Sequence, residues 1–266
     1  MGIFNALNHA KDEGDLARRD ALLGELRRLH SQCPEDAAVR ESLARGLFNG
    51  MIDVGAEGDL ARRDSLLEEL RRLHAGWSED AAVRRSLSAG YFNAVCWAKA
   101  EEDLSRRDEV LEELRRLQGQ WTEDVAVREH LARGLYNALN DARDEGELAQ
   151  RDVVLDELRV LQESWPEDAL VREQLAMGLY NALNQAEDEG AVARRDVMLE
   201  QLRRLQGRWP EDTAARKLFA MALYNAVIDA EEEGNQSGYK ALSGELLGFR
   251  YRYPDDAYWS EIPDLP

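Results

Sequence analysis

Apolar residues recur along the chain at spacings of three and four, which is the period of one face of an α-helix. Leu22, Leu26 and Leu29 are spaced four and then three apart, and similar stripes follow at regular intervals. A second kind of segment carries Leu43 and Leu47, with further apolar residues beside them, within one arc of a helical wheel. The pattern therefore predicts two alternating amphipathic helices and an all-α fold.

The same pattern repeats every 44 residues without a gap. Blocks that begin at Gly2, Gly46, Gly90, Gly134, Gly178 and Ala222 open with closely similar heptapeptides, such as GLFNGMI and GLYNALN. Neither helix of a block can bury its stripe alone, so neighbouring blocks must stack into a solenoid. We expect one solenoid domain, residues 1–266, made of six repeats: 2–45, 46–89, 90–133, 134–177, 178–221 and 222–265. The last repeat is expected to act as a C-terminal cap.

Signals for helix ends recur with the repeat. A first helix is expected from about Pro34 to Glu57, because proline and acidic residues suit a first helical turn. The glycine that follows, such as Gly58, suits the left-handed residue beyond a helix C-terminus. Glu102 occupies that glycine position in one repeat. A second helix is expected to begin after Asp59 and its equivalents Asp15 and Asp103, which are good N-caps.

These residues resemble the tetratricopeptide repeat superfamily. The order of Pro166, Leu175, Ala176, Gly178 and Tyr180 is similar to the first helix of that family. The resemblance implies a right-handed α-solenoid whose first helices line a concave groove that binds peptides or protein surfaces. The repeat departs from the family in its length, 44 residues rather than the usual 34. It also has arginine where an early aromatic residue is expected: Arg40, Arg84, Arg128, Arg172 and Arg216.

One polar residue recurs on the side of the first helix opposite to the buried arc. With Arg40 at zero on the wheel, Asn49 falls at about 180°. An amide has one acceptor and two donors, so it can pair with any peptide backbone. The candidate ligand-binding residues are therefore this series and three of its variable neighbours: Asn5, Asn49, Asn93, Asn137, Asn181, Asn225, Arg45, Arg133 and Trp97.

The asparagine series has an alternative, structural interpretation. Each side chain could bond to the adjacent first helix and fix the stacking angle, and one ladder could do both. The favoured function is a scaffold that binds a protein or peptide partner in the groove. Two other functions stay open, a self-associating or spacer solenoid and a regulatory or sensor arm of a larger multidomain protein.

An Arg-Arg-Asp motif opens the second helix, as in Arg62–Arg63–Asp64. We expect it to form salt bridges between repeats, with Asp20-type carboxylates meeting Arg40-type guanidiniums; an anion-binding stripe is the alternative. The recurring tryptophans, which include Trp77 and Trp121, are expected to be part of the core.

Composition and charge narrow the range of possible functions further. The net charge of −19 opposes binding to nucleic acid or to an anionic membrane. Two cysteines at unrelated repeat positions indicate a reducing, cytoplasmic setting without a disulfide framework. Histidine spacings match no zinc motif, and phosphate-binding and nucleophile motifs are missing, so we expect neither enzyme activity nor a cofactor. The last repeat gains aromatic residues that could also support self-association: Tyr251, Tyr253, Tyr258 and Trp259.

Overall fold

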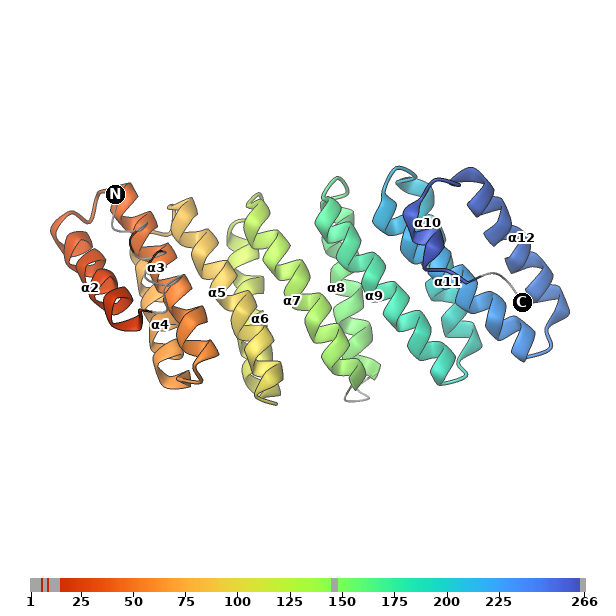
Figure 1. The fold of residues 1–266 in the computed structure, drawn as a ribbon, viewed down its shortest axis with the longest axis horizontal. Helices are drawn as coiled ribbons and strands as arrows, with labels where there is room; N and C mark the ends of the chain where they lie inside the picture. Colours follow the sequence, from red (N-terminus) through yellow and green to blue (C-terminus); the bar gives the residue numbers. More distant parts are fainter. Residues whose placement is uncertain (1–5, 7–8, 10–14, 145–147, 264–266) are drawn as a thin grey trace. The chain divides into compact units, whose positions relative to one another are not determined.

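The computed structural model describes residues 6, 9, 15–144 and 148–263 (Figure 1). Eleven α-helices and one short 3₁₀ helix, and no strand, occur among these residues. The all-α solenoid class expected from the sequence is therefore confirmed. The chain forms two compact units, unit 1 (residues 1–134) and unit 2 (residues 135–266).

Two kinds of helix alternate along the chain. The first helices have 20 residues each and start at residues 37, 81, 125, 169 and 213, each 44 after the one before. They are α3 (Ala37–Ala56), α5 (Ala81–Ala100), α7 (Val125–Asp144), α9 (Ala169–Asp188) and α11 (Thr213–Glu232). The second helices have 17 residues each: α2 (Leu16–Gln32), α4 (Leu60–Gly76), α6 (Leu104–Gln120), α8 (Leu148–Ser164), α10 (Val192–Arg208) and α12 (Gln236–Arg252). A 3₁₀ helix, η1 (Ala257–Ser260), follows α12.

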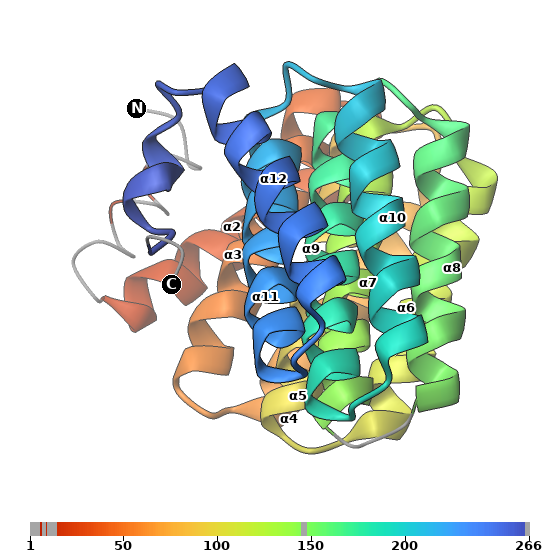
Figure 2. The ribbon, with the colours of Figure 1, turned by 90° about the vertical axis from the view of Figure 1, so that its right-hand side faces the viewer.

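Helices pack against their neighbours in the chain and one repeat away. In unit 1, α3 contacts α4 and α5, while α4 also contacts α5. In unit 2, α9 contacts α10 and α11, and α11 contacts both α10 and α12. Within each unit, first helices thus pack against second helices and beside the first helix of a neighbouring repeat, as α3 does with α5 and α9 with α11. Figure 2 shows α12 in front of α11 at the end of unit 2.

The first helices begin three residues later than the sequence analysis placed them. Asp36, not Pro34, is the N-cap, and its carboxylate accepts the backbone N–H groups of Ala38 and Val39. Pro34 lies in the preceding turn. The acidic residue therefore acts as a capping acceptor, which satisfies two orphan donors at the helix start. Asp80 and Asp168 each accept the two equivalent N–H groups, and Asp212 accepts one, from Ala215 at 3.0 Å.

The residues predicted to end the first helix and to begin the second helix are confirmed where the structure describes them. Gly58, Gly190 and Gly234 have φ of +81°, +64° and +68°. Glu102 takes the same turn with φ of +57°, in a region that disfavours a side chain. Asp59 caps the second helix by accepting the N–H of Arg62 at 3.1 Å.

Both units have leucine-rich cores. Leu47, Leu70 and Leu114 are fully buried in unit 1, and Leu139 and Leu158 in unit 2. The apolar face is less completely buried on α2, the first described helix, where Leu22 and Leu29 are only half-buried. None of the described helices combines the length and apolar character needed to cross a membrane.

Candidate functional site

The candidate asparagines lie at one position of successive first helices. Asn49 is on α3, Asn93 on α5, Asn137 on α7, Asn181 on α9 and Asn225 on α11, and all five are half-buried. Asn5 lies outside the described residues. The five side chains therefore lie at the boundary of the packed layer instead of standing free in solvent.

In unit 2 the asparagines bond to the first helix of the preceding repeat. The Nδ2 of Asn181 donates to Asn140 Oδ1 at 2.8 Å and to Tyr136 Oη at 3.2 Å. Asn225 repeats the arrangement with Asn184 at 3.0 Å and with Tyr180 at 3.5 Å. We call these groups the Asn–Tyr–Asn clusters. Their bonds have the geometry that the stacking interpretation of the series describes.

Unit 1 has the same asparagine without the same neighbours. The positions of Tyr136 and Asn140 are held one and two repeats earlier by Phe92 and Cys96, and by Phe48 and Ile52. The Nδ2 of Asn93 donates instead to the carbonyl of Ala89 in its own helix, at 2.9 Å. Phe48 and Ile52, one repeat before Asn93, carry no side-chain atom that accepts a hydrogen bond, so Asn93 cannot form this cluster.

The variable neighbours of the asparagines are placed differently from one another. Arg45 is exposed and forms an ion pair with Glu41 at 2.9 Å, one helical turn away. Arg133 is half-buried on α7. Trp97 is half-buried, and its ring centroid lies 5.0 Å from the guanidinium carbon of Arg63. These three residues lie on three different helices, α3, α7 and α5, and no contact among them is described.

The second arginine of the Arg-Arg-Asp motif is buried in every described copy. Arg19 is 2% exposed and lies 3.1 Å from Asp53, one turn beyond Asn49 on α3. Arg195 contacts Asp229 on α11 at 3.2 Å in the same way. Charged groups buried in this way need partners. Asp53 and Asp229 are the repeat equivalents of Trp97, one of the candidate ligand contacts. This position of the repeat therefore also supplies partners for a buried arginine.

The first arginine and the aspartate of the motif join second helices of neighbouring repeats. Arg62 pairs with Asp20, and Arg106 with Asp64 in the same register. Arg62 and Arg19 hold the pKa of the Asp20 carboxyl below its usual value through hydrogen bonds and charge, although partial burial opposes them. Salt bridges between repeats were expected, but the partner that was named for Asp20 was wrong.

Arg40-type residues form a different junction, which we call the Arg–Trp–Asp clamp. The Nε of Arg40 donates to Asp80 Oδ2 at 2.9 Å, and its Nη1 donates to the carbonyl of Pro34 at 2.8 Å. The guanidinium carbon lies 4.1 Å from the ring centroid of Trp77. Burial acts to raise the pKa of Asp80, but Arg40 and two backbone N–H groups outweigh it and lower the pKa. The partners lie 37 and 40 residues after the arginine, so each clamp links one repeat to the next.

The clamp recurs in both units. Arg84 donates to Asp124 at 2.6 Å and lies over Trp121, and Arg172 donates to Asp212 at 2.5 Å and lies over Trp209. The recurring tryptophans are thus half-buried stacking platforms for arginine. Contrary to the expectation from the sequence, they are therefore not buried in the core, but they do have a structural role at the junctions between repeats.

One carboxyl group of unit 2, that of Glu187, has a raised pKa. Burial, together with the nearby Asp229 carboxylate, raises the pKa of Glu187 to about 8, although Arg195 opposes the shift. These residues line a small cavity of about 240 Å³ with Glu232 and Glu233. Like charges so close favour a shared proton.

Among the described residues no group of three metal-ligating side chains occurs, and both cysteines are free thiols. The arrangement instead offers amides, hydroxyls and ion pairs repeated along packed helices.

The fold and the recurring junctions define an all-α helical-repeat protein. In comparisons with family models, curated proteins and solved structures, no match to this chain was found.

Proposed function

We propose that the chain is a protein-interaction solenoid of the tetratricopeptide-like kind, right-handed and cytoplasmic, with a peptide site on its first helices. The observation that carries the proposal is the bonding of the Asn–Tyr–Asn clusters. The two bonds from Asn181 use both hydrogens of its amide, so its oxygen is the group left to accept. Tyr136 accepts one of these bonds, so its hydroxyl hydrogen is left to donate.

Each cluster thus offers one acceptor and one donor, which is what one peptide unit of an extended chain requires. The bonds within the cluster fix the amide before a ligand arrives, which lowers the ordering cost of binding. Half-buried rings and a thioether, including Tyr180 and Met177 on α9, flank these groups and provide apolar contact. The same cluster can therefore stabilise stacking and bind a peptide.

Helix packing supports the choice of the first-helix face. Within each unit the first helices of neighbouring repeats contact each other, as α3 and α5 do, and as α9 and α11 do. Second helices of neighbouring repeats have backbones that lie farther apart in the described residues and meet through long side chains, such as Arg203 and Glu245. Closer spacing on one side of a stack bends it toward that side, so the first helices should line the inner, concave face.

The experiment uses Tyr136→Phe and Tyr180→Phe together, which removes the donor hydroxyl of both clusters and keeps both rings. The full chain and this variant are used as baits in a quantitative pull-down from cell extract, and their thermal melts are compared. We expect partners to be lost while the melting temperature falls by only about 5 °C or less, since two half-buried hydrogen bonds, at 3.2 and 3.5 Å, are removed. Retention of every partner by the variant would argue against the peptide site.

A second candidate function, a spacer solenoid whose asparagines only fix the stacking, is favoured by the inter-repeat bonds themselves. On that view, Asn181→Ala with Asn225→Ala lowers stability and leaves every partner bound. The same pull-down and melt distinguish the two candidates.

A further inference from the structure

The face of α12 that points away from α11 carries an apolar groove. A cavity of about 960 Å³ lies along this helix and the segment after it. Its wall includes Tyr239, Lys240, Leu246, Leu247, Arg250 and Trp259. We call this surface the α12 groove. Leu247 is 57% exposed, which is high for a leucine at the wall of a groove.

The repeat shows what the equivalent surface holds elsewhere. On α10, one repeat earlier, the residues equivalent to Tyr239 and Leu247 are Arg195 and Arg203. Arg195 bonds to Asp229 on α11, and Arg203 lies over the Phe219 ring of the same helix. The groove therefore corresponds to the place where a second helix receives the first helix of the next repeat.

The α12 groove has nevertheless lost the chemistry that joins one repeat to another. Tyr239 replaces a buried arginine, and Leu247 replaces the arginine that elsewhere pairs with a glutamate, as Arg203 does with Glu245 at 2.7 Å. Lys240 replaces the aspartate that receives an arginine at internal junctions, as Asp152 does from Arg194. A repeat from a second copy would thus bring arginine against lysine and glutamate against leucine, both of which are unfavourable.

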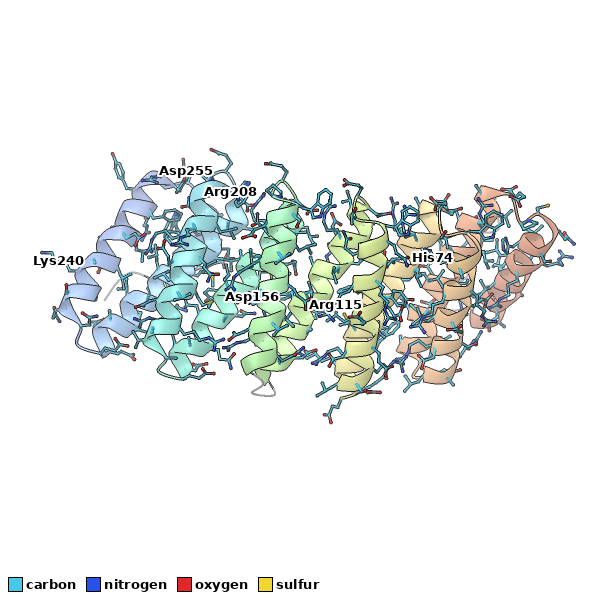
Figure 3. The ribbon with its side chains drawn as sticks, turned by 180° about the vertical axis from the view of Figure 1, so that it is seen from behind. His74, Arg115, Asp156, Arg208, Lys240 and Asp255 are labelled. Carbon is cyan, nitrogen blue, oxygen red and sulfur yellow. The ribbon has the colours of Figure 1, made fainter. Side chains whose placement is uncertain are left out.

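The charged residues among the described lining of the groove, Lys240 and Arg250, are both positive, although the chain as a whole carries −19. Lys240 points away from the rest of unit 2 (Figure 3), and no partner for it is described. The guanidinium carbon of Arg250 lies 5.6 Å from the ring centroid of Trp259, so this cation is held at the groove wall. A basic rim on an acidic protein attracts a negatively charged partner.

We propose that the α12 groove binds an amphipathic, acidic helix of a partner protein. The apolar stripe of that helix covers Leu246, Leu247 and Trp259, and its carboxylates meet Lys240 and Arg250. These two cations lie ten positions apart on one helix, or roughly 15 Å. A partner helix lying along α12 therefore needs acidic residues about ten positions apart that flank apolar residues at three- and four-residue spacing. This site is separate from the first-helix face, so it stands or falls independently of the proposed function.

The test selects helical peptides of about 18 residues, roughly 27 Å long, from a displayed random library. The full chain is the bait, and the Leu247→Asp variant is used for counter-selection. We expect enriched peptides to carry the acidic pair and the apolar stripe. No enrichment, or enrichment of basic peptides, would overturn the proposal.

An enriched peptide is then synthesised with a fluorescent label, and its binding to the full chain is measured by anisotropy. Leu247→Asp should weaken binding at least about tenfold, because it places a charge against the apolar stripe. Lys240→Glu with Arg250→Glu should also weaken it at least about tenfold, and a peptide with lysines in place of its acids should restore binding. Val197→Asp on α10 is the control, since Val197 is equally apolar and 51% exposed but lies outside the groove. Equal loss in the control would contradict the assignment.

Two further measurements identify other occupants. Light scattering that gives twice the chain mass, and a single mass for Leu247→Asp, would show that a second copy covers the groove. Binding to phosphatidylserine vesicles that is lost in the Lys240→Glu, Arg250→Glu variant would show a lipid surface instead. Either result replaces the partner helix.

Discussion

Asn93 in unit 1 and Asn181 in unit 2 occupy the same position of the repeat and make different bonds. Asn93 bonds within its own helix, whereas Asn181 bonds to two side chains of the preceding first helix. The cause lies one repeat earlier, where unit 1 has Phe48 and Ile52, and unit 2 has Tyr136 and Asn140. A residue that recurs in a repeat protein therefore has a role that is set by the neighbouring repeat as much as by its own.

The Arg–Trp–Asp clamps should contribute equally to the stability of the two units. Removal of a clamp is the substitution with the largest expected effect. Arg84→Ala in unit 1 and Arg172→Ala in unit 2 each leave an aspartate, only 15% or 12% exposed, without its cation. Each should lower the free energy of unfolding by about 3 kcal/mol in urea titrations, near the lower end for buried pairs. The exposed neighbour Arg85→Ala is the control and should cost less than about 0.5 kcal/mol. Losses that differ by more than about 1 kcal/mol between the units would show that the junctions are not equivalent.

The contribution of the recurring asparagine to stability should differ between the units. Asn181→Ala removes two inter-repeat hydrogen bonds and should cost about 1–2 kcal/mol. Asn93→Ala should cost less than about 0.5 kcal/mol, because its bond lies within one helix and alanine favours helix. Urea unfolding of both variants measures the difference.

The comparison can be sharpened by moving the cluster. Phe48→Tyr with Ile52→Asn places in unit 1 the two groups that accept from asparagine in unit 2. In this background Asn93→Ala should become more costly by about 1 kcal/mol, as a double-mutant cycle would measure. An unchanged cost would mean that the acceptors alone do not create the cluster.

The smallest effect concerns pH and Glu187, whose repeat equivalents in unit 1 are Lys11, Gly55 and Lys99. The pKa of Glu187 is about 8 in the folded chain and 4.5 in its unperturbed state, so folding retains a proton between these values. Stability should therefore fall as the pH rises from about 4.5 to 8. Glu187→Gln should remove this dependence and be more stable than the wild type at pH 9, by about 1 kcal/mol after solvent screening. Melts at pH 5 and pH 9 measure it, and an equal gap at both values would contradict the assignment.

Much of the fold could be predicted from the sequence, because the helical period and the capping residues are local signals. Asp59 and Gly58 have the roles that were predicted for them. The start at Pro34 was wrong because proline and aspartate are both compatible with a helix start, and only the position of the Asp36 carboxylate separates the two.

The pairing of charges could not be predicted in the same way. Arg40, Arg62 and Arg63 all recur with one period, so the sequence alone does not determine which carboxylate lies beside which guanidinium. The stacking offset between helices brings Asp80 to Arg40 and Asp20 to Arg62. The Asn–Tyr–Asn cluster had a readable signal, since Tyr136 precedes Asn137 where Phe48 precedes Asn49. The α12 groove had one too, in Lys240 and Leu247, but its location depends on how α12 packs.

The Arg–Trp–Asp clamp also bears on how such a chain changes length. Its arginine and aspartate lie 40 residues apart in neighbouring repeats, and Tyr253 and Asp256 supply the partners of Arg216 near the C-terminus. Unequal recombination that duplicates or deletes 44 codons among the internal repeats creates a junction whose arginine again meets a tryptophan and an aspartate. We therefore expect gene variants with different numbers of internal repeats to keep these junctions, and the lengths of natural alleles to differ in steps of 44 residues.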